Sequence, residues 1–388
     1  MIIKSVVIEN KNIHITAIAS YAIFPAKMGG QKGIASFYKS FSKQLPTTLI
    51  SVKKNDVPPD FTAEVLPILS NSKSRYVNPF LFFTLRKILK ERKTTHLIIE
   101  HPYYGWLGML AKWFLRVKLV IHSHNIESLR FKSTGKWWWG ILWHYERFTH
   151  RRADINFFIS DEDRIFAIDK FKLKTEKCFT ITYGFDFSNA PSAEEKSAAK
   201  KMLQTTHQIP SENKILLFNG TLDYAPNLDA LKIIISKINP VLKSNNHFHY
   251  TIIICGKNIP ALFNELKDEL KNNIVYAGFV NDITLYFKGA DIFINPVIEG
   301  GGIKTKLVEA LGYNLSCIST TEGAIGVPID ITGNKLKVVI EKDWELFAQQ
   351  IITLDAKTGQ IGADFFNHFF WEQIAKKAAN AILTNTSS

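Results

Sequence analysis

The stretch Ala290–Gly312 reads ADIFINPVIEGGGIKTKLVEALG and decides the fold class. It opens with a short run of β-branched and aromatic residues, which is typical of a buried strand. Three consecutive glycines follow, and then a segment of helical length. A strand, a glycine turn and a helix in this order form one β-α unit of a parallel sheet. Backbone amides in such a turn, with the helix N-terminus behind them, can approach a phosphate group closely.

The same alternation of strand-like and helix-like segments runs along the whole chain of 388 residues, and this length favours two domains. In the first half, strands are expected near 14–20, 47–52, 96–100, 117–122, 155–159 and 178–182, and helices near 34–44, 80–93, 105–115, 137–151 and 161–169. In the second half, strands are expected near 215–218, 250–255, 274–276, 291–295, 315–319 and 337–340, and helices near 227–237, 260–270, 283–288, 304–312 and 343–352. We therefore predict an α/β fold with domains 1–190 and 191–365, and a helix within 366–388 that packs back on the first domain.

Charge is distributed unevenly along the chain. The net charge is +13, and residues 1–150 hold 22 lysines and arginines against 8 acidic residues, whereas residues 191–388 hold 19 against 20. The excess positive charge therefore belongs to the first domain. It indicates an anionic partner for that domain, either a membrane surface, a phosphorylated acceptor or nucleic acid.

The composition indicates a folded protein of a reducing compartment. Cys178, Cys255 and Cys317 are far apart, each in or beside an apolar run, and are expected to be free buried thiols. Residues 1–10 lack the long apolar region of an export signal, and basic residues interrupt the apolar stretch Tyr103–Ile121. We expect a cytoplasmic protein that is soluble or peripheral on the inner face of the membrane.

The stretch Ala290–Gly312 closely resembles the donor-binding region of family 4 glycosyltransferases, in which a strand ending in Pro runs into a glycine loop and a helix that carries Glu, Ala and Gly. The resemblance covers nearly the whole chain through further motifs in order: HSHNIE at 122–127, RAD at 152–154, YGFD at 183–186, FNGTLD at 218–223 and GFVND at 278–282. It implies the GT-B fold, in which two doubly wound Rossmann-like domains face a central cleft. It also implies transfer of a sugar from a nucleotide diphosphate with retention at the anomeric carbon.

Donor contacts are expected in two glycine turns. The first turn, Pro25–Gly33, would contribute Gly29 and Gly30, and the alternative is a turn that needs glycine only for a positive φ. Lys304 and Lys306 are assigned to catalysis as partners of the diphosphate, because lysine at a helix start is unfavourable until an anion binds there. Two solvated surface lysines are the alternative. The remaining donor contacts expected in the second domain are Gly220, Glu299, Gly301, Gly302, Ile303 and Glu309.

Glu309 lies farther along the same expected helix, where its carboxylate would accept hydrogen bonds from ribose hydroxyls. The family usually has a second glutamate eight positions earlier, but this chain has Gly301 there. Glu299 is the candidate substitute. The family's usual Arg and Lys are also missing from residues 219–227, which leaves the two lysines of the helix start as the phosphate partners.

His124 ends an expected strand, at the position where a histidine of the family faces the transferred sugar. A neutral imidazole can orient a sugar hydroxyl without acting as a nucleophile. The neighbours His122, Asn125 and Glu127 are candidate acceptor contacts, with strand-end caps as the alternative. Asp161 and Asp163 resemble a metal-binding pair, but they follow Ser160 at a predicted helix start, where acidic residues are favoured in any case. No metal ion or other cofactor is expected.

The residues and the resemblance together predict a retaining glycosyltransferase with a nucleotide-sugar donor and a saccharide or lipid-linked acceptor, in cell-surface polysaccharide or glycolipid synthesis. No second carboxylate is evident near His124, so the donor phosphate itself is expected to receive the acceptor proton. One alternative is a non-catalytic protein that binds an anionic surface or nucleic acid, but it does not explain the glycine loop of the neutral second domain. A GT-B sugar epimerase is another. We expect no nucleic acid as a partner.

Tryptophans and basic residues coincide in the first domain. Aromatic rings beside cations are typical of proteins that touch a membrane interface, which favours reversible binding to anionic membranes. The alternative is that the tryptophans pack inside the domain, since three adjacent positions of a helix cannot all point one way. The residues concerned are Trp106, Trp113, Trp137, Trp138, Trp139 and Trp143, with Arg130, Lys132 and Lys136.

Overall fold

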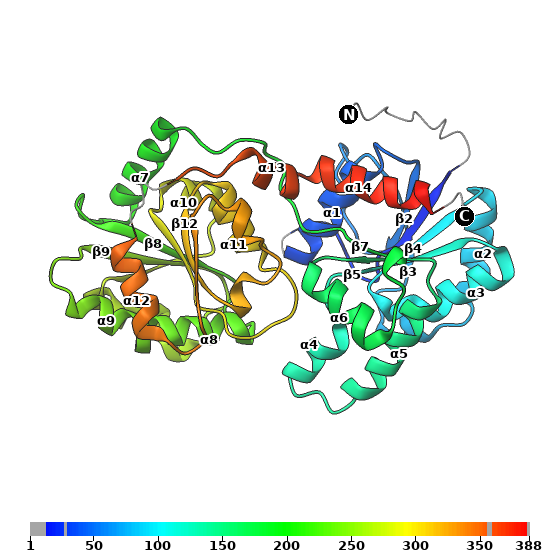
Figure 1. Cartoon of the computed structure of the whole chain (residues 1–388), viewed down its shortest axis with the longest axis horizontal. Coiled ribbons are helices and arrows are strands. Elements are labelled where there is room, and N and C mark those ends of the chain that lie inside the picture. Colours follow the sequence, from blue (N-terminus) through cyan, green and yellow to red (C-terminus); the bar gives the residue numbers. More distant parts are fainter. Residues whose placement is uncertain (1–12, 27–28, 355–358, 386–388) are drawn as a thin grey trace. The chain divides into compact units, whose positions relative to one another are not determined.

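The structure, a computed structural model, describes residues 13–26, 29–354 and 359–385. Residues 1–10, for which no export signal is expected, lie outside the described residues, as do two positions of the first glycine turn. The chain divides into two units, with boundaries after Asp186 and after Phe370, and the last helix belongs to the first unit (Figure 1). The sequence pattern placed these boundaries after residues 190 and 365. Phe187 belongs to unit 2 because its ring packs 4.7 Å from that of Tyr313.

Unit 1 is built on a seven-stranded sheet in the order β3-β2-β1-β4-β5-β6-β7, and all of its neighbouring strands are parallel. The order reverses between β1 and β4. In such sheets ligands bind beyond the carboxyl ends of the strands at this switch point. The strands are β1 (Ile15–Ile18), β2 (Thr47–Val52), β3 (Glu64–Leu69), β4 (His96–Glu100), β5 (Lys118–Ser123), β6 (Ile155–Phe158) and β7 (Cys178–Thr180).

Helices cover both faces of this sheet (Figure 1). On one face α1 (Gly29–Phe41) packs against α14 (Trp371–Thr384), and the ring of Trp371 lies 5.4 Å from that of Tyr183. The hydrophobic cluster on the other face includes Leu85, Leu107 and Ile121. The helices of that face are α2 (Leu81–Glu91), α3 (Gly105–Leu115), α5 (Trp139–Arg152) and α6 (Asp161–Phe171), and the short α4 (Glu127–Ser133) packs on α5.

Unit 2 repeats the design with a six-stranded parallel sheet in the order β10-β9-β8-β11-β12-β13. The strands are β8 (Lys214–Asn219), β9 (Tyr250–Cys255), β10 (Ile274–Gly278), β11 (Ile292–Asn295), β12 (Ser316–Thr320) and β13 (Leu336–Val339). On one face α7 (Ala193–His207) packs against α10 (Ile283–Gly289). The other face carries α8 (Ala225–Ile233), the π-helical η4 (Ile234–Ile238), α9 (Asn239–Ser244) and α12 (Trp344–Thr353). Helix α11 (Thr305–Gly312) follows β11, and α13 (Ala363–Phe369) precedes α14.

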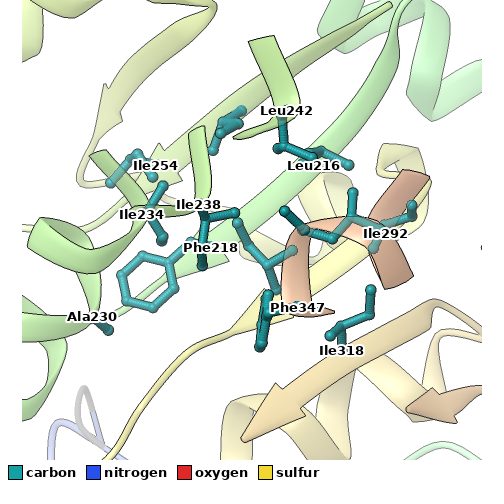
Figure 2. Close-up of a cluster of buried hydrophobic side chains, with 14 of the residues drawn as sticks. Leu216, Phe218, Ala230, Ile234, Ile238, Leu242, Ile254, Ile292, Ile318 and Phe347 are labelled. Carbon is teal, nitrogen blue, oxygen red and sulfur yellow. The ribbon is translucent and has the colours of Figure 1, made fainter. Parts of the chain in front are cut away.

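Figure 2 shows the hydrophobic core between the sheet of unit 2 and the helices η4, α9 and α12. Side chains of four strands point toward η4, α9 and α12, and burial of each large side chain contributes about 1.5–3 kcal/mol. The labelled side chains are all buried: Leu216, Phe218, Ala230, Ile234, Ile238, Leu242, Ile254, Ile292, Ile318 and Phe347. This core anchors the strands whose carboxyl ends carry the donor-site candidates.

The structure confirms the predicted α/β class and the two parallel sheets. It also confirms the helix start at Ser160, whose side chain accepts a hydrogen bond from the Asp163 backbone N–H at 3.2 Å. The three cysteines are buried and free. The helix expected near 260–270 is wrong, because Ala261–Asn272 forms 3₁₀ turns interrupted at Asn264–Leu266, where φ is positive. Among the described residues, no helix is both long and apolar enough to cross a membrane.

Candidate active site

A polar cluster lies at the carboxyl ends of β4 and β5 in unit 1. Glu100 ends β4 and pairs in register with His122 of β5, and His124 follows directly after β5. Strand β4 borders the switch point of the sheet. The fold therefore places these three side chains where an α/β sheet binds its ligand.

The Glu100 carboxylate accepts hydrogen bonds from both imidazoles. Nδ1 of His122 lies 3.0 Å from Oε1, and Nε2 of His124 lies 2.6 Å from Oε2, while the Tyr38 hydroxyl also donates to Oε1. Glu100 is fully buried. Burial alone would raise the pKa of this carboxyl, but the two histidines together lower it well below its usual range, so Glu100 is ionised. A buried carboxylate with these partners fixes the orientation of the His124 ring.

A second buried carboxylate, Glu127 at the start of α4, lies beside the first group. It accepts hydrogen bonds from His101 Nδ1 at 3.0 Å, from the Tyr103 hydroxyl at 2.7 Å and from Arg130 Nε at 2.9 Å. Burial raises the pKa of Glu127, but His101 and Arg130 outweigh it and lower the pKa overall. The ring of His101 stacks on that of His124, with centroids 4.6 Å apart. The two carboxylate groups therefore form one connected cluster.

The backbone of His101 is strained. Its φ of 61° and ψ of 158° lie in a region that glycine favours, and such a conformation costs about 1–3 kcal/mol. The backbone N–H of His101 donates to the carbonyl oxygen of His122 at 2.9 Å, which helps to hold this conformation. Strained residues cluster at functional sites, and this one carries the ring that stacks on His124.

Glu146 of α5 supports the cluster from beneath. Its carboxyl group accepts hydrogen bonds from the backbone N–H groups of Glu127 and Ser128, at 2.9 and 3.0 Å, and so caps the start of α4. Burial raises the pKa of Glu146, and the nearby negative charge of Glu127 raises it further. The hydrogen bonds offset only part of this increase, and the pKa is about 7. The position of Glu127 thus depends on a residue of the neighbouring helix.

The cluster forms part of the wall of a cavity of about 950 Å³ within unit 1. His101, His124, Asn125 and Glu127 line it, and so does Gly30 near the start of α1. Convergent polar groups with perturbed pKa values in a large cavity are typical of a ligand site. Gly29 and His122 are not among the lining residues, and His122 is buried behind His124 with 4% of its surface exposed.

Glu100, His122 and His124 are also residues of metal-ligating type, and one donor atom from each lies within 4.8 Å of the others. In the structure both imidazole nitrogens that face the carboxylate are hydrogen-bonded to it. A metal ion at this place would have to replace those bonds. Asp161, which with Asp163 resembles a metal-binding pair in the sequence, accepts hydrogen bonds from Arg164 and Thr180.

In unit 2 the glycine loop connects β11 to α11. Gly300 has a φ of 107° and Gly302 a φ of 68°, so both positions favour glycine. Lys304 is the N-cap residue of α11, and its own side chain makes no capping hydrogen bond to the helix. Its ammonium group donates to the carbonyl oxygens of Gly300 at 2.7 Å and of Gly302 at 2.9 Å, which closes the loop on itself.

Lys306 lies in the first turn of α11 and reaches across to β8. Its ammonium group donates to the Asn219 carbonyl oxygen at 3.1 Å and to Asn227 Oδ1 at 3.0 Å, above the ring of Phe218. Burial lowers the pKa of Lys306 to about 7, and the positive charge of Lys304 adds to this effect. Protein oxygens therefore hold both ammonium groups, which counts against the alternative of two solvated surface lysines.

The other expected donor residues surround this helix start. Gly220 follows β8, and a Cβ atom at that position would come within 2.7 Å of the Asn227 side chain. Gly302 and Ile303 are buried, Gly301 and Glu299 are exposed, and Glu309 is half-buried farther along α11. The structure thus gathers Gly220, Glu299, Gly301, Gly302, Ile303, Lys304 and Lys306 around one helix N-terminus, with Glu309 on the same helix.

Sequence reasoning missed several members of both groups. Glu100 and His101 follow directly after an expected strand, and the position of strand ends in α/β sheets was the signal that could have found them. Asn219 and Asn227 are the two ends of the segment 219–227 that lacks the family's usual Arg and Lys, but nothing in the pattern indicated that they hold Lys306. Tyr103 and Glu146 gave no local signal, and Arg130 was named only for the membrane contact, because the roles of all three in the cluster depend on tertiary contacts.

Two family models match the chain. The model described as Glycosyltransferase Family 4 matches residues 40–189, and the model described as Glycosyl transferases group 1 matches residues 213–356. With one match on each Rossmann-like unit, the protein is a glycosyltransferase of the GT-B fold. The chain belongs to glycosyltransferase family 4.

Comparison with individual proteins adds two relatives and a solved structure. The uncharacterized 44.6 kDa protein in the cps region of Klebsiella pneumoniae is 26% identical over 323 residues, which cover 79% of this chain and 75% of the relative. Chitobiosyldiphosphodolichol beta-mannosyltransferase of Debaryomyces hansenii is 23% identical over 322 residues, 74% of this chain and 68% of that protein. The solved structure of Anabaena Alr3699/HepE in complex with UDP-glucose has the same fold, with a TM-score of 0.69 and 14% identity over 96% of this chain and 100% of that chain.

Proposed function

We propose that this glycosyltransferase moves a sugar from a nucleotide diphosphate sugar to an acceptor hydroxyl, with retention at the anomeric carbon and without a metal ion. The observation that carries the donor assignment is the start of α11, where a loop with two glycines of positive φ leads directly into the helix N-terminus. Such an arrangement suits a diphosphate. The UDP-glucose bound by a protein of the same fold supports the choice of donor class.

In unit 2, the amides of the glycine loop and the ammonium group of Lys306 are assigned to the leaving diphosphate, whose negative charge grows as the sugar departs. Lys304 keeps the loop in shape and adds positive charge. The carboxylate of Glu309 is assigned to the ribose hydroxyls. Glu299 and the exposed Gly301 complete the donor contacts.

In unit 1, His124 is assigned to a hydroxyl of the transferred sugar, with Glu100 as the residue that orients its ring. The bond between the anomeric carbon and the phosphate oxygen breaks while the acceptor oxygen bonds to the same carbon, and the acceptor proton passes to the donor phosphate. Asn125 and Glu127, which line the cavity, are assigned to the acceptor. His122 positions Glu100 and needs no contact with either substrate.

The acceptor is a saccharide or a lipid-linked sugar, and the pathway is the synthesis of a cell-surface polysaccharide or glycolipid at the inner face of the membrane. Two observations support this part of the proposal. One relative is named for a cps region, and the name of another specifies a sugar linked to diphosphodolichol.

The proposal is tested by screening UDP-, GDP- and ADP-sugars for thermal stabilisation and for slow hydrolysis of the donor. The sugars of one nucleotide class should raise the melting temperature. A ligand at one hundred times its dissociation constant should add about 2.7 kcal/mol to the free energy of unfolding. The released sugar should be the donor's own sugar, whereas an epimerase would release its epimer. A screen in which no nucleotide sugar stabilises the protein or is cleaved would refute the proposal.

A further inference from the structure

The cavity of unit 1 has a large apolar wall that the polar cluster does not use. This wall contains Tyr76, Trp106, Phe131, Trp138, Leu142 and Tyr145. Sugar hydroxyls require polar partners, whereas a wall of this kind matches a hydrocarbon chain. Each methylene that leaves water for such a wall increases affinity about fourfold.

Polar atoms of two of these wall residues are engaged with the protein itself. Trp106 Nε1 donates to the Tyr76 carbonyl oxygen at 2.9 Å, and the Tyr145 hydroxyl donates to the Tyr103 carbonyl oxygen at 3.2 Å. The rings of Phe131 and Trp138 pack against each other with centroids 4.5 Å apart. The wall therefore offers a ligand mainly ring faces and aliphatic carbon.

The apolar wall continues to the protein surface. Val77, at the end of the 3₁₀ helix η1 (Lys73–Val77), lines the cavity and is 78% exposed. Trp137 and Ile141, which precede the wall residues Trp138 and Leu142, are 84% and 68% exposed. Exposed large apolar side chains on the segments that line an apolar cavity suit contact with an apolar partner.

Three exposed lysines lie on or beside the segments that carry these side chains. Lys73 lines the cavity, Lys132 lies near the end of α4, and Lys136 lies in the turn before α5. The ammonium group of Lys132 also lies 4.7 Å from the ring centroid of Trp139. Aromatic side chains interleaved with lysines suit the interface of an anionic bilayer. We call Val77, Trp137, Ile141 and these three lysines the membrane rim.

We propose that the acceptor is a lipid-linked sugar taken from an anionic membrane, with the membrane rim on the bilayer and the beginning of the lipid chain against the apolar wall. Its sugar then lies at Asn125 and Glu127, which line the same cavity. This inference rests on the proposed function and narrows its acceptor to an amphiphile. Trp113, which is exposed on α3, does not line the cavity and has no part in the site.

The apolar wall is tested by calorimetry in the absence of any nucleotide sugar. The two ligands are dodecyl maltoside, used below its critical micelle concentration, and maltose, which differs only in lacking the tail. Dodecyl maltoside should bind at least a hundredfold more tightly than maltose. Trp138→Ala and Leu142→Gln should each weaken its binding tenfold or more, and Trp113→Ala, the matched control, should not. Equal binding of the two sugars, or full binding by both wall variants, would overturn the inference.

The membrane rim is tested by co-sedimentation with vesicles of phosphatidylcholine alone and with phosphatidylglycerol added. We expect binding to the anionic vesicles that salt weakens, and a loss of fivefold or more in Ile141→Glu and in Lys136→Glu. Equal, negligible binding to both vesicle types at low salt overturns the membrane rim. Donor hydrolysis is measured on the same preparations: if it is intact while the lipid assays fail, only the lipid assignment falls, and if it is absent, the proposed function falls.

Discussion

The Nε2 atom of His124 lies 2.6 Å from the Oε2 atom of Glu100, a carboxylate that is fully buried. His122 and Tyr38 donate to the other oxygen of the same group. A short bond to an ionised, buried acceptor holds the imidazole in one orientation and keeps a proton on the nitrogen that faces Glu100. The remaining nitrogen of His124, Nδ1, is the atom that this arrangement leaves for a sugar hydroxyl.

Glu100→Gln should therefore lower kcat while leaving the KM for the donor nearly unchanged, because the change disturbs the orientation of His124. Loss of a charge-assisted hydrogen bond worth about 1.5–3 kcal/mol predicts roughly a ten- to a hundredfold effect. Tyr38→Phe, which removes a different bond to the same carboxylate, is the matched control and should reduce kcat much less. Steady-state kinetics of the two variants checks this, and equal losses would assign Glu100 a structural role.

Glu309→Gln should weaken nucleotide binding without unfolding unit 2. A carboxylate that accepts hydrogen bonds from ribose hydroxyls loses about 1.5–3 kcal/mol when it becomes an amide. Calorimetry with the preferred nucleotide measures the change, and Glu345→Gln on the exposed face of α12 is the control. If the affinity of Glu309→Gln stays at the wild-type value, Glu309 does not belong to the donor site.

Lys306 should take up a proton when the nucleotide binds. Its pKa is about 7 in the unliganded protein, and a neighbouring diphosphate favours the charged ammonium group. At pH 8, where phosphate groups are fully ionised, calorimetry in two buffers of different ionisation enthalpy should detect this uptake. It should vanish in Lys306→Met and persist in Lys237→Met.

Lys306 should also make the stability of the unliganded protein depend on pH. The folded-state pKa of about 7 lies below the ordinary value of 10.5, so between these values the unfolded chain binds more protons. The free energy of unfolding should therefore rise with pH in this range. The stability that neutral Lys306 contributes is lost as the pH falls through 7. Thermal unfolding of Lys306→Met against pH checks the sign, since the variant should show a shallower rise.

Activity should persist in excess chelator, because the diphosphate is assigned to amides and lysines. The measurement is donor turnover before and after treatment with EDTA, with added magnesium or manganese as the second arm. Loss of activity that either metal restores would contradict metal independence. It would direct attention to Glu100, His122 and His124, whose donor atoms lie within 4.8 Å of one another.

The α/β class, most of the strands and the glycine loop could be predicted from the sequence, because buried parallel strands are short apolar runs and their turns carry glycine. Strand β3 could not. Its residues, Glu64–Leu69, are partly exposed and include Pro67, which an edge strand tolerates but which counts against a strand in any local reading. Helix α4 was missed because it has only seven residues and because the cap at its start comes from Glu146 on another helix.

The candidate site was predictable where function follows from position in a motif, as for His124 at a strand end and for the glycines before α11. It was not predictable where function depends on tertiary contacts. The strained backbone of His101 and the burial of Lys306 against Asn219 both depend on neighbours that are distant in the sequence. The membrane rim was partly visible as tryptophans beside lysines, but only the structure separates Trp137 and Trp138 from Trp113.

The most direct test of the central claim, sugar transfer with retention, is proton NMR of the sugar first released or transferred from an α-linked nucleotide sugar. The spectrum must be recorded before the released sugar equilibrates between its anomers. We predict that the α-anomer forms first, because the acceptor oxygen bonds on the face from which the diphosphate leaves. Initial formation of the β-anomer would contradict the mechanism assigned to this protein.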